Sequence, residues 1–216
     1  MKAEGDAAES NGVVDLEGLT AGQIERRERV LRTALELGRV GGYDAVQMRD
    51  VAAEAGVALG TIYRYFSSKD HLLAAALVLW VTELENQVTL RPPSGSTTTA
   101  RVLSVIERAQ RAMEREQNLS EALVTALVSP DPGAAACQRQ MTIIMTRTIA
   151  RGLGEDLDTS LRADTARILG HVWFSALVGW VLGWSDIDKV SDEVSVAGHL
   201  MLDHLDRPHG ERRKRP

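Results

Sequence analysis

The segment Gly42–Lys69 constrains the fold of this chain more than any other part of its sequence. Its hydrophobic pattern predicts two short helices, Met48–Ala55 and Leu59–Phe66, joined by a tight turn at Gly56. Two helices joined through a turn of about three or four residues cross at a steep angle. Gly56 permits the positive φ that such a turn needs, and Ala52 is small where the helices approach each other. The segment therefore predicts a helix-turn-helix unit.

The side chains of this unit separate into a core set and an exposed set. Four apolar side chains supply a minimal core, namely Val51, Val57, Ile62 and Phe66. The second helix then exposes short polar, aromatic and cationic side chains, namely Thr61, Tyr63, Arg64 and Tyr65. Such groups reach phosphates and base edges in a DNA major groove. The pattern favours DNA binding, and an unrelated helical packing unit is the alternative.

Helical periodicity continues on both sides of this unit, and no stretch alternates apolar and polar residues as a strand would. One helix is expected from Ile24 to the Gly41–Gly42 pair, where glycine ends it. Another is expected to start at Ser67–Asp70, where a serine caps it, and to reach Val88. Further helices are expected over Thr99–Glu116, Ser120–Val128, Gly133–Gly152, Thr159–Trp184 and Lys189–Leu205. The sequence therefore predicts an all-α fold.

The composition limits the surface charge and the cellular compartment that we expect for this chain. The formal net charge of −5 argues against a broad basic surface, so DNA binding must rest on a few well-placed cations. The single Cys137 forms no internal disulfide, which favours a reducing, cytoplasmic location. The most apolar window, Val172–Trp184, is shorter than the roughly 20 apolar residues that a membrane-spanning helix needs.

The sequence carries no signature of an enzyme. It has no glycine-rich phosphate loop, no paired-cysteine metal motif and no His-Glu-x-x-His stretch. His199 and His204 are five residues apart, a spacing that suits a shared metal ion poorly. We therefore expect neither catalysis nor a metal ion nor a cofactor. A helical adaptor that binds only protein is the remaining alternative to a DNA-binding protein.

The helix-turn-helix segment resembles the DNA-binding region of the tetracycline-repressor (TetR) family. The resemblance covers roughly residues 26 to 80, and it is carried by Arg49-Asp-Val-Ala, Ala55-Gly-Val and Gly60-Thr-Ile-Tyr-Arg-Tyr-Phe-Ser-Ser-Lys. Two positions depart from the family pattern, because either Gln47 or Val46, and also Ala58, stands where a capping threonine or serine is common. Each missing cap costs about 1 kcal/mol of helix stability.

The resemblance implies that nine residues contact DNA: Gln47, Arg49, Leu59, Gly60, Thr61, Tyr63, Arg64, Tyr65 and Lys69. Arg49 and Arg64 are the expected contacts to guanine, because arginine bridges O6 and N7. Tyr63, Tyr65 and Lys69 are the expected contacts to the phosphate backbone. For Tyr65, a place in the core is the alternative.

Beyond the family level, several segments resemble the regulators of bacterial cholesterol and steroid catabolism, namely Gly41–Arg49, His71–Leu73, Arg111–Met113, Leu119–Leu123, Ala166–Leu169 and Val172–Ser175. This resemblance implies a repressor that leaves its operator when it binds a coenzyme A thioester of a steroid-derived acid. The implied wall of an apolar effector cavity is Met113, Leu123, Leu127, Met141, Ile144, Met145, Trp173, Leu177 and Trp180. Two alternatives stay open: these residues are ordinary core, or the chain regulates another pathway, such as efflux or fatty-acid metabolism, with an unrelated ligand.

The family resemblance also implies a homodimer. The Val172–Trp184 stretch is apolar around nearly its whole circumference and needs cover on all sides, and Gly179 and Gly183 would let a partner helix approach closely. Dimerisation through the last two helices would set two recognition helices about 34 Å apart on an inverted repeat of double-stranded operator DNA. A monomer with a buried central helix is the alternative.

These expectations divide the chain into four segments. They are a disordered N-terminal arm over residues 1–22, a three-helix DNA-binding domain over 23–70, a larger helical effector-binding and dimerisation domain over 71–206, and a basic disordered tail over 207–216. We expect the cations of the tail, Arg212–Arg215, to act as a loose solubilising end rather than as a DNA-binding arm.

Overall fold

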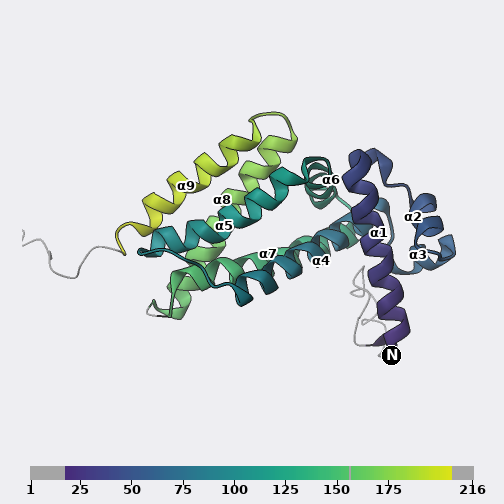
Figure 1. The fold of residues 1–216 in the computed structure, drawn as a ribbon, viewed down its shortest axis with the longest axis horizontal. Helices are drawn as coiled ribbons and strands as arrows, with labels where there is room; N and C mark the ends of the chain where they lie inside the picture. The colour runs from purple at the N-terminus through teal and green to yellow at the C-terminus, as the bar shows by residue number, and fades with distance from the viewer. Residues whose placement is uncertain (1–17, 156, 206–216) are drawn as a thin grey trace, which may run out of the picture. The chain divides into compact units, whose positions relative to one another are not determined.

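The computed structural model of the protein describes residues 18–155 and 157–205 (Figure 1). Over these residues the chain forms nine α-helices and no strand, which confirms the all-α prediction. In chain order the helices are α1 (Ala21–Ala45), α2 (Met48–Glu54), α3 (Leu59–Tyr65), α4 (Lys69–Leu90), α5 (Thr98–Arg115), α6 (Gln117–Leu127), α7 (Pro132–Leu153), α8 (Thr159–Val181) and α9 (Ile187–Leu202). Most of the predicted N-terminal arm and all of the predicted basic tail lie outside the described residues.

The helices divide into two compact units. Of the described residues, the first unit holds 18–83 together with Met113–Ile143, and so contains α1, α2, α3, α6 and the first parts of α4 and α7. The second unit holds Leu84–Ala112 together with the described residues of 144–205, and so contains most of α5, all of α8 and α9, and the last parts of α4 and α7. The predicted domain boundary after residue 70 stays a prediction.

The ends of α1 follow from its capping and glycine residues. The helix begins at Ala21, before the expected Ile24, because the side-chain oxygen of Gln23 accepts a hydrogen bond from the backbone N–H of Thr20 at 2.8 Å. Gly41 and Gly42 leave helical geometry, and Gly42 takes a φ of 67°. The predicted glycine break is therefore confirmed, and a short helical stretch follows it as far as Ala45.

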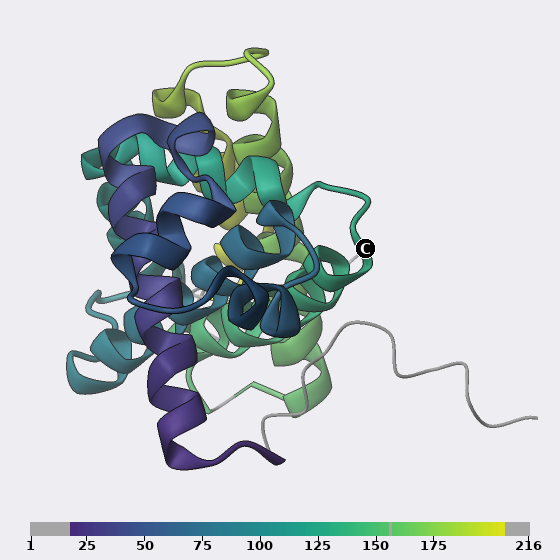
Figure 2. The same cartoon turned by 90° about the vertical axis from the view of Figure 1, so that its right-hand side faces the viewer.

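The core of the first unit lies between α1 and its neighbours. Val30, Leu31 and Ala34 have the spacing of one helical face, and all three are buried on α1. This helix packs against α6 and α2 (Figures 1 and 2). A Cβ at Gly38 would lie 2.8 Å from Leu119 Cδ1, so the glycine lets α1 approach α6 closely.

The second unit is built on the pairing of α8 with α9, which lie side by side in Figure 1. Leu169 and Trp173 of α8 are buried, as are Val190 and Val194 of α9. A Cβ at Gly198 would lie 2.8 Å from Leu103 Cδ2, so α9 also contacts α5 closely. None of the helices in the described parts of the chain combines the length and the apolar character that a membrane span needs.

The end of α8 corrects one expectation. The helix stops at Val181 rather than Trp184, because Gly183 adopts a φ of 73° and closes a Schellman motif. The N–H of Gly183 donates to the Trp180 carbonyl at 2.9 Å, and the N–H of Trp184 donates to the Gly179 carbonyl at 2.8 Å. Gly183 therefore ends the helix and does not present a smooth helical face for a partner.

Candidate nucleic-acid interface

The turn between α2 and α3 is a Schellman motif centred on Gly56. Gly56 has a φ of 64°, which confirms the positive φ expected from the sequence. Its N–H donates to the Ala53 carbonyl at 3.2 Å, and the N–H of Val57 donates to the Ala52 carbonyl at 3.0 Å. These two bonds satisfy the last carbonyls of α2 and turn the chain directly into α3. The helix-turn-helix geometry thus comes from local hydrogen bonds that the Ala-Gly-Val sequence permits.

The short helix α3 has a buried face and an exposed face. Ile62 and Tyr65 are three residues apart and are buried, and Phe66 directly after the helix is also buried. The side chain of Tyr63 is 53% exposed, and Arg64 is exposed beside it. The buried residues therefore anchor α3 to the first unit and leave the opposite face open to a partner.

The two helices begin without side-chain caps, as their departures from the family pattern predict. Neither Gln47 before α2 nor Ala58 before α3 makes a side-chain capping bond. The Gln47 side chain instead donates to the Asp44 carbonyl at 2.8 Å. Gln47 and Arg49 are both exposed, so each is accessible for the DNA contact predicted for it.

The remaining predicted DNA contacts differ in accessibility. Gly60 is exposed, whereas Leu59 and Thr61 are half-buried. The prediction that Tyr65 is exposed is wrong, because its side chain is only 3% exposed and belongs to the core. Its hydroxyl accepts a hydrogen bond from Arg64 Nη2 at 3.2 Å. The guanidinium carbon of Arg64 also lies 5.2 Å from the centre of the Tyr65 ring. Tyr65 thus positions the Arg64 side chain through this hydrogen bond and the ring contact, and its own contact to phosphate stays a prediction.

Lys69 lies at the first turn of α4 and packs on the ring of Tyr43. Its ammonium is 3.7 Å from the ring centre, which is a cation–π contact. Burial lowers the pKa of Lys69. The Tyr43 hydroxyl donates to Asp70 Oδ1 at 2.5 Å, and burial together with this bond raises the pKa of Tyr43 to about 12. Lys69 is therefore held against Tyr43 near the end of α1, and its contact to phosphate stays a prediction.

The start of α4 is tied to the loop between α6 and α7, which the sequence did not indicate. Ser68 Oγ caps α4 by accepting from the His71 N–H at 3.0 Å, which confirms the predicted serine cap. Ser129 of the loop donates to Asp70 Oδ2 at 2.6 Å. The hydroxyl of Ser67 donates to the Asp131 carboxylate at 3.3 Å. These bonds join residues about 60 positions apart, so no local pattern could reveal them.

Two further polar side chains near the start of α4 and the α6–α7 loop, His71 and Cys137, are buried. His71 is 6% exposed, and burial lowers its pKa. Its ring lies so close to Gly133 that a Cβ there would come within 2.3 Å of Nδ1. Cys137 is buried as well, and burial raises the pKa of its thiol to about 11. The thiol is therefore protonated at neutral pH, which does not suit a redox sensor.

The predicted effector wall falls on both units. Met113, Leu123, Leu127 and Met141 belong to the first unit, and Ile144, Met145, Trp173, Leu177 and Trp180 belong to the second. All nine side chains are buried except that of Met141, which is half-buried. Trp173 also lines a cavity of about 230 Å³ in the second unit, beside α5 and α9. Their role as a ligand wall stays a prediction, because burial alone equally suits core residues.

Within residues 18–155 and 157–205, no group of three or more histidine, cysteine, aspartate or glutamate side chains is arranged to hold a metal ion. His199 instead lies 3.1 Å from the Asp203 carboxylate, one turn further along the chain.

Two family models, both of tetracycline-repressor type, match the N-terminal and the C-terminal parts of the chain. Residues 30–76 match the family model described as "Bacterial regulatory proteins, tetR family", and residues 95–201 match "Tetracyclin repressor-like, C-terminal domain". The HTH-type transcriptional repressor KstR of Rhodococcus jostii strain RHA1 is 37% identical over 180 residues, which cover 83% of this chain and 84% of that protein.

Two solved structures have a similar fold. The crystal structure of a TetR transcriptional regulator from Rhodococcus sp. RHA1 has a TM-score of 0.70 and 28% identity, and it covers 85% of this chain and 99% of that one. The structure of Thermus thermophilus FadR, a TetR-family repressor in complex with lauroyl-CoA, has a TM-score of 0.65 and 20% identity. The match covers 88% of this chain and 98% of the FadR chain.

Proposed function

Because this chain belongs to the TetR family of bacterial regulatory proteins, we propose that it is a transcriptional repressor that a small apolar effector releases from its operator. The observation that carries the proposal is α3, whose buried Ile62 and Tyr65 leave Tyr63 and Arg64 directed outward. A seven-residue helix anchored on one face and cationic on the other has the size and chemistry to enter a major groove.

In this proposal, two arginines recognise the base sequence of the operator DNA. Arg64 of α3 and Arg49 of α2 bridge guanine O6 and N7, while Tyr63 and Lys69 hold phosphates on either side. Gln47, Leu59, Gly60 and Thr61 complete the contact surface. The chain has a formal net charge of −5, so it has no broad basic surface to attract DNA. DNA affinity in this proposal therefore depends on a few cations that contact specific bases and phosphates.

A homodimer formed through α8 and α9 suits this mode of binding. Both helices carry exposed apolar side chains, namely Leu161, Ile168, Val196 and Leu200. Exposed apolar residues gathered on one helix pair are typical of an interaction surface. Two copies related by a twofold axis would present two α3 helices to successive major grooves of an inverted repeat in the cytoplasm.

The effector in this proposal is a steroid or another acyl-CoA thioester. Two observations support this class: the KstR repressor is a relative over most of the chain, and the fold resembles that of a repressor crystallised with lauroyl-CoA. The second observation makes a fatty acyl-CoA the competing effector. The buried methionines and tryptophans of the predicted wall suit either, because flexible and polarizable side chains adapt to bulky apolar ligands.

Helix α4 is the element through which an effector would act on DNA binding. It contributes Lys69–Glu83 to the first unit and Leu84–Leu90 to the second, and its first turn bonds to Tyr43 and Ser129. Effector binding that displaces α4 would move the DNA-binding helices and weaken operator affinity. Coupling free energies between such sites are typically about 1–3 kcal/mol.

The test is a titration of the purified protein onto a fluorescent duplex from its own upstream region, followed by addition of a steroid acyl-CoA, lauroyl-CoA or the free steroid acid. We expect salt-sensitive binding that the steroid thioester releases. Arg64→Ala should weaken specific binding by about 1–3 kcal/mol, whereas Arg139→Ala, an exposed arginine on α7, should leave it unchanged.

The outcomes separate the parts of the proposal. Release by lauroyl-CoA alone would replace the steroid effector with a fatty acyl one. Release by neither thioester would remove the effector class and leave the repressor. Equal affinities for Arg64→Ala and wild-type protein across operator and random duplexes would contradict α3 as the recognition helix.

A further inference from the structure

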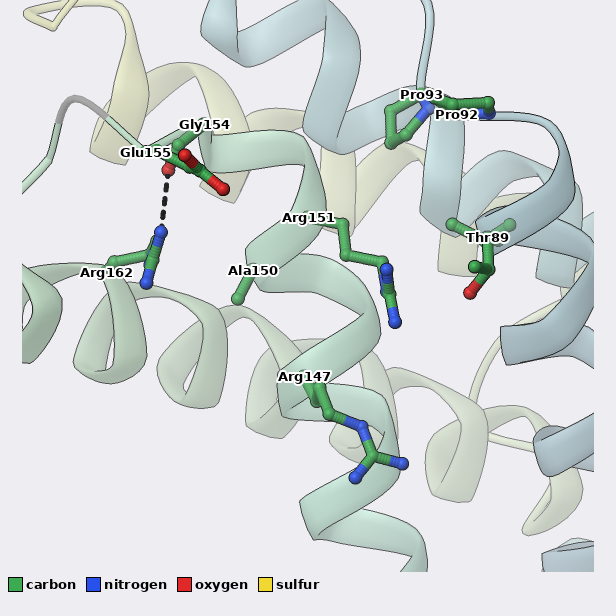
Figure 3. A pocket seen from close by; sticks show the side chains of 10 residues that line it. Thr89, Pro92, Pro93, Arg147, Ala150, Arg151, Gly154, Glu155 and Arg162 are labelled. Atoms are coloured by element: carbon green, nitrogen blue, oxygen red, sulfur yellow. Dashed lines mark hydrogen bonds between the residues drawn. The ribbon is translucent and has the colours of Figure 1, made fainter.

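The second unit contains a cavity of about 410 Å³ whose wall carries three arginines (Figure 3). Arg147 and Arg151 come from α7, and Arg162 comes from α8. Glu155 is the one carboxylate among the lining side chains, and Thr89 lines the wall contributed by α4. Its volume falls in the range of small-molecule sites, and its lining combines these cations with apolar residues such as Val88, Pro92 and Pro93.

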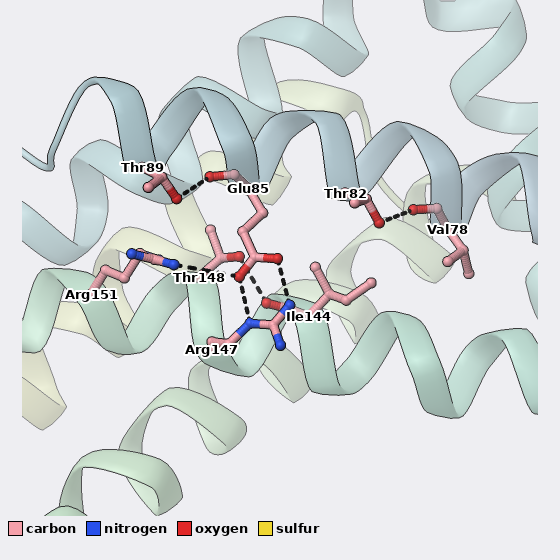
Figure 4. Close-up of polar contacts among 8 residues, drawn as sticks. All are labelled: Val78, Thr82, Glu85, Thr89, Ile144, Arg147, Thr148 and Arg151. Carbon is pink, nitrogen blue, oxygen red and sulfur yellow. Dashed lines mark hydrogen bonds and ion pairs between the residues drawn. The ribbon is translucent and has the colours of Figure 1, made fainter. Parts of the chain in front are cut away.

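A buried carboxylate holds two of these arginines in place (Figure 4). Nε and Nη2 of Arg147 donate to the two carboxylate oxygens of Glu85, each at 2.5 Å. Nη2 of Arg151 lies 3.8 Å from Glu85 Oε1. The Glu85 side chain is 8% exposed, whereas those of Arg147 and Arg151 are 56% and 39% exposed. Each guanidinium therefore meets Glu85 on its inner side and solvent on its outer side.

The charges of this group are fixed at neutral pH. The hydrogen bond from Arg147 lowers the pKa of Glu85, and the same bond raises the pKa of Arg147. One bidentate pair thus uses the inner edge of Arg147 and leaves its third nitrogen, Nη1, outside that pair.

The third arginine is positioned from the other side of the cavity. Nη1 of Arg162 donates to the Gly154 carbonyl at 3.2 Å, a bond drawn in Figure 3. Gly154 has a φ of 78° and ends the α7 segment, so the turn after α7 fixes where Arg162 lies. The cavity thus gathers three arginines that are already positioned before any ligand arrives, which reduces the entropy lost on binding.

We propose that this arginine pocket binds the phosphate groups of a coenzyme A thioester, and this inference rests on the proposed effector class. Guanidinium groups pair with phosphate oxygens through two parallel hydrogen bonds, and several guanidinium groups around one pocket match the many anionic oxygens of a diphosphate better than the single carboxylate of a steroid acid. Among the described residues the lining holds three arginines and one carboxylate, Glu155, and Glu85 behind them is already paired with Arg147, so the pocket attracts an anion. Ile144 and Met145 of the predicted apolar wall lie on the same helix as Arg147. The pantetheine arm of coenzyme A separates the acyl group from the phosphates, so the acyl group would lie away from the arginine pocket, toward that wall.

The decisive experiment measures binding to the full-length protein by calorimetry with four probes: steroid acyl-CoA, free coenzyme A, the free steroid acid and inorganic pyrophosphate. The variants are Arg151→Gln and Arg162→Gln, each of which removes one charge without leaving Glu85 unpaired. We expect each variant to weaken thioester binding by about tenfold, because each removes charge-assisted hydrogen bonds to the phosphates. Binding of the steroid acid should not change.

Arg167→Gln is the matched control, because Arg167 lies on the same helix as Arg162 but is exposed and paired with Asp164. It should leave all affinities unchanged. Arg162→Lys keeps the charge without the planar fork, so we expect it to restore part of the lost affinity. Higher ionic strength should weaken binding of the thioester but not of the acid.

Thioester affinity within twofold of wild type in both glutamine variants would overturn the inference, while operator release by the thioester would leave the proposed function intact. Pyrophosphate binding that needs Arg162 while thioester binding does not would overturn it as well, by assigning the pocket to a free phosphate ligand. Equal losses for the thioester and the steroid acid would also overturn it, because they would indicate a general structural defect.

Discussion

Replacing Gly56 by alanine tests whether the helix-turn-helix geometry depends on backbone conformation at a single residue. Gly56 has a φ of 64°, in the left-handed region that side chains disfavour. An added Cβ meets nothing within 4 Å, so the substitution creates no clash. The whole effect of Gly56→Ala must therefore come from the backbone.

The expected magnitude follows from that conformation. An L-residue held in the left-handed region costs about 1–2 kcal/mol, so Gly56→Ala should lower the free energy of unfolding by that amount. Gly60→Ala is the matched control, since Gly60 lies inside α3 with a negative φ and its Cβ also meets nothing within 4 Å. Alanine is favoured over glycine in a helix by about 1 kcal/mol. The same chemical change four residues away should thus stabilise the protein.

Urea unfolding followed by circular dichroism measures both effects. All variants must be compared at one protein concentration, because the stability of an oligomer depends on the concentration of its protomers. Shifts of opposite sign with unchanged m values are expected. Equal midpoints for Gly56→Ala and wild type, or shifts of the same sign in the two variants, would refute the assignment of the turn to left-handed strain.

Two further predictions concern buried titratable groups of the first unit. Because burial lowers the pKa of His71 from its ordinary 6.5, the folded state favours the neutral ring, and stability should decline as the pH falls below that value. His71→Gln should flatten this part of a pH series of urea midpoints, and parallel profiles would contradict the prediction. Because Cys137 is buried and burial raises the pKa of its thiol to about 11, native protein should react with a thiol reagent at neutral pH only as fast as it opens, and rapid labelling without denaturant would contradict this.

Most helices could be predicted from the sequence because their signals are local. The spacing of apolar residues, the serine at position 68 and the glycines at 41 and 42 each act within one or two turns, and their outcomes match the structure. The error at the end of α8 has the same origin. The apolar run continues to Trp184, but Gly183 closes the Schellman motif, so capping decides the boundary against hydrophobicity.

The recognition helix α3 could also be predicted because its signals are local, whereas the long-range contacts that hold the neighbouring start of α4 in place could not. The exposure predicted for Tyr65 was wrong, and its alternative, a place in the core, is what the structure shows: Ile62 and Tyr65 are three residues apart, so the helical period puts both on the inner face. The packing of Lys69 on Tyr43 and the bond from Ser129 to Asp70 join residues 26 and 59 positions apart. Contacts of that separation depend on how helices pack, and a single sequence contains no periodic trace of them.

The arginine pocket illustrates why polar sites escape a reading of one sequence. Glu85, Arg147 and Arg162 each resemble an ordinary residue on a solvated helix face, and only the folded chain brings them together. Burial of an unpaired carboxylate costs several kcal/mol, so the 8% exposure of Glu85 requires the cations that surround it. Arg147 satisfies Glu85 more directly than Arg151 does, at 2.5 Å against 3.8 Å. Stability therefore constrains Arg147 most strongly, and Arg151 and Arg162 are the residues left to serve a ligand.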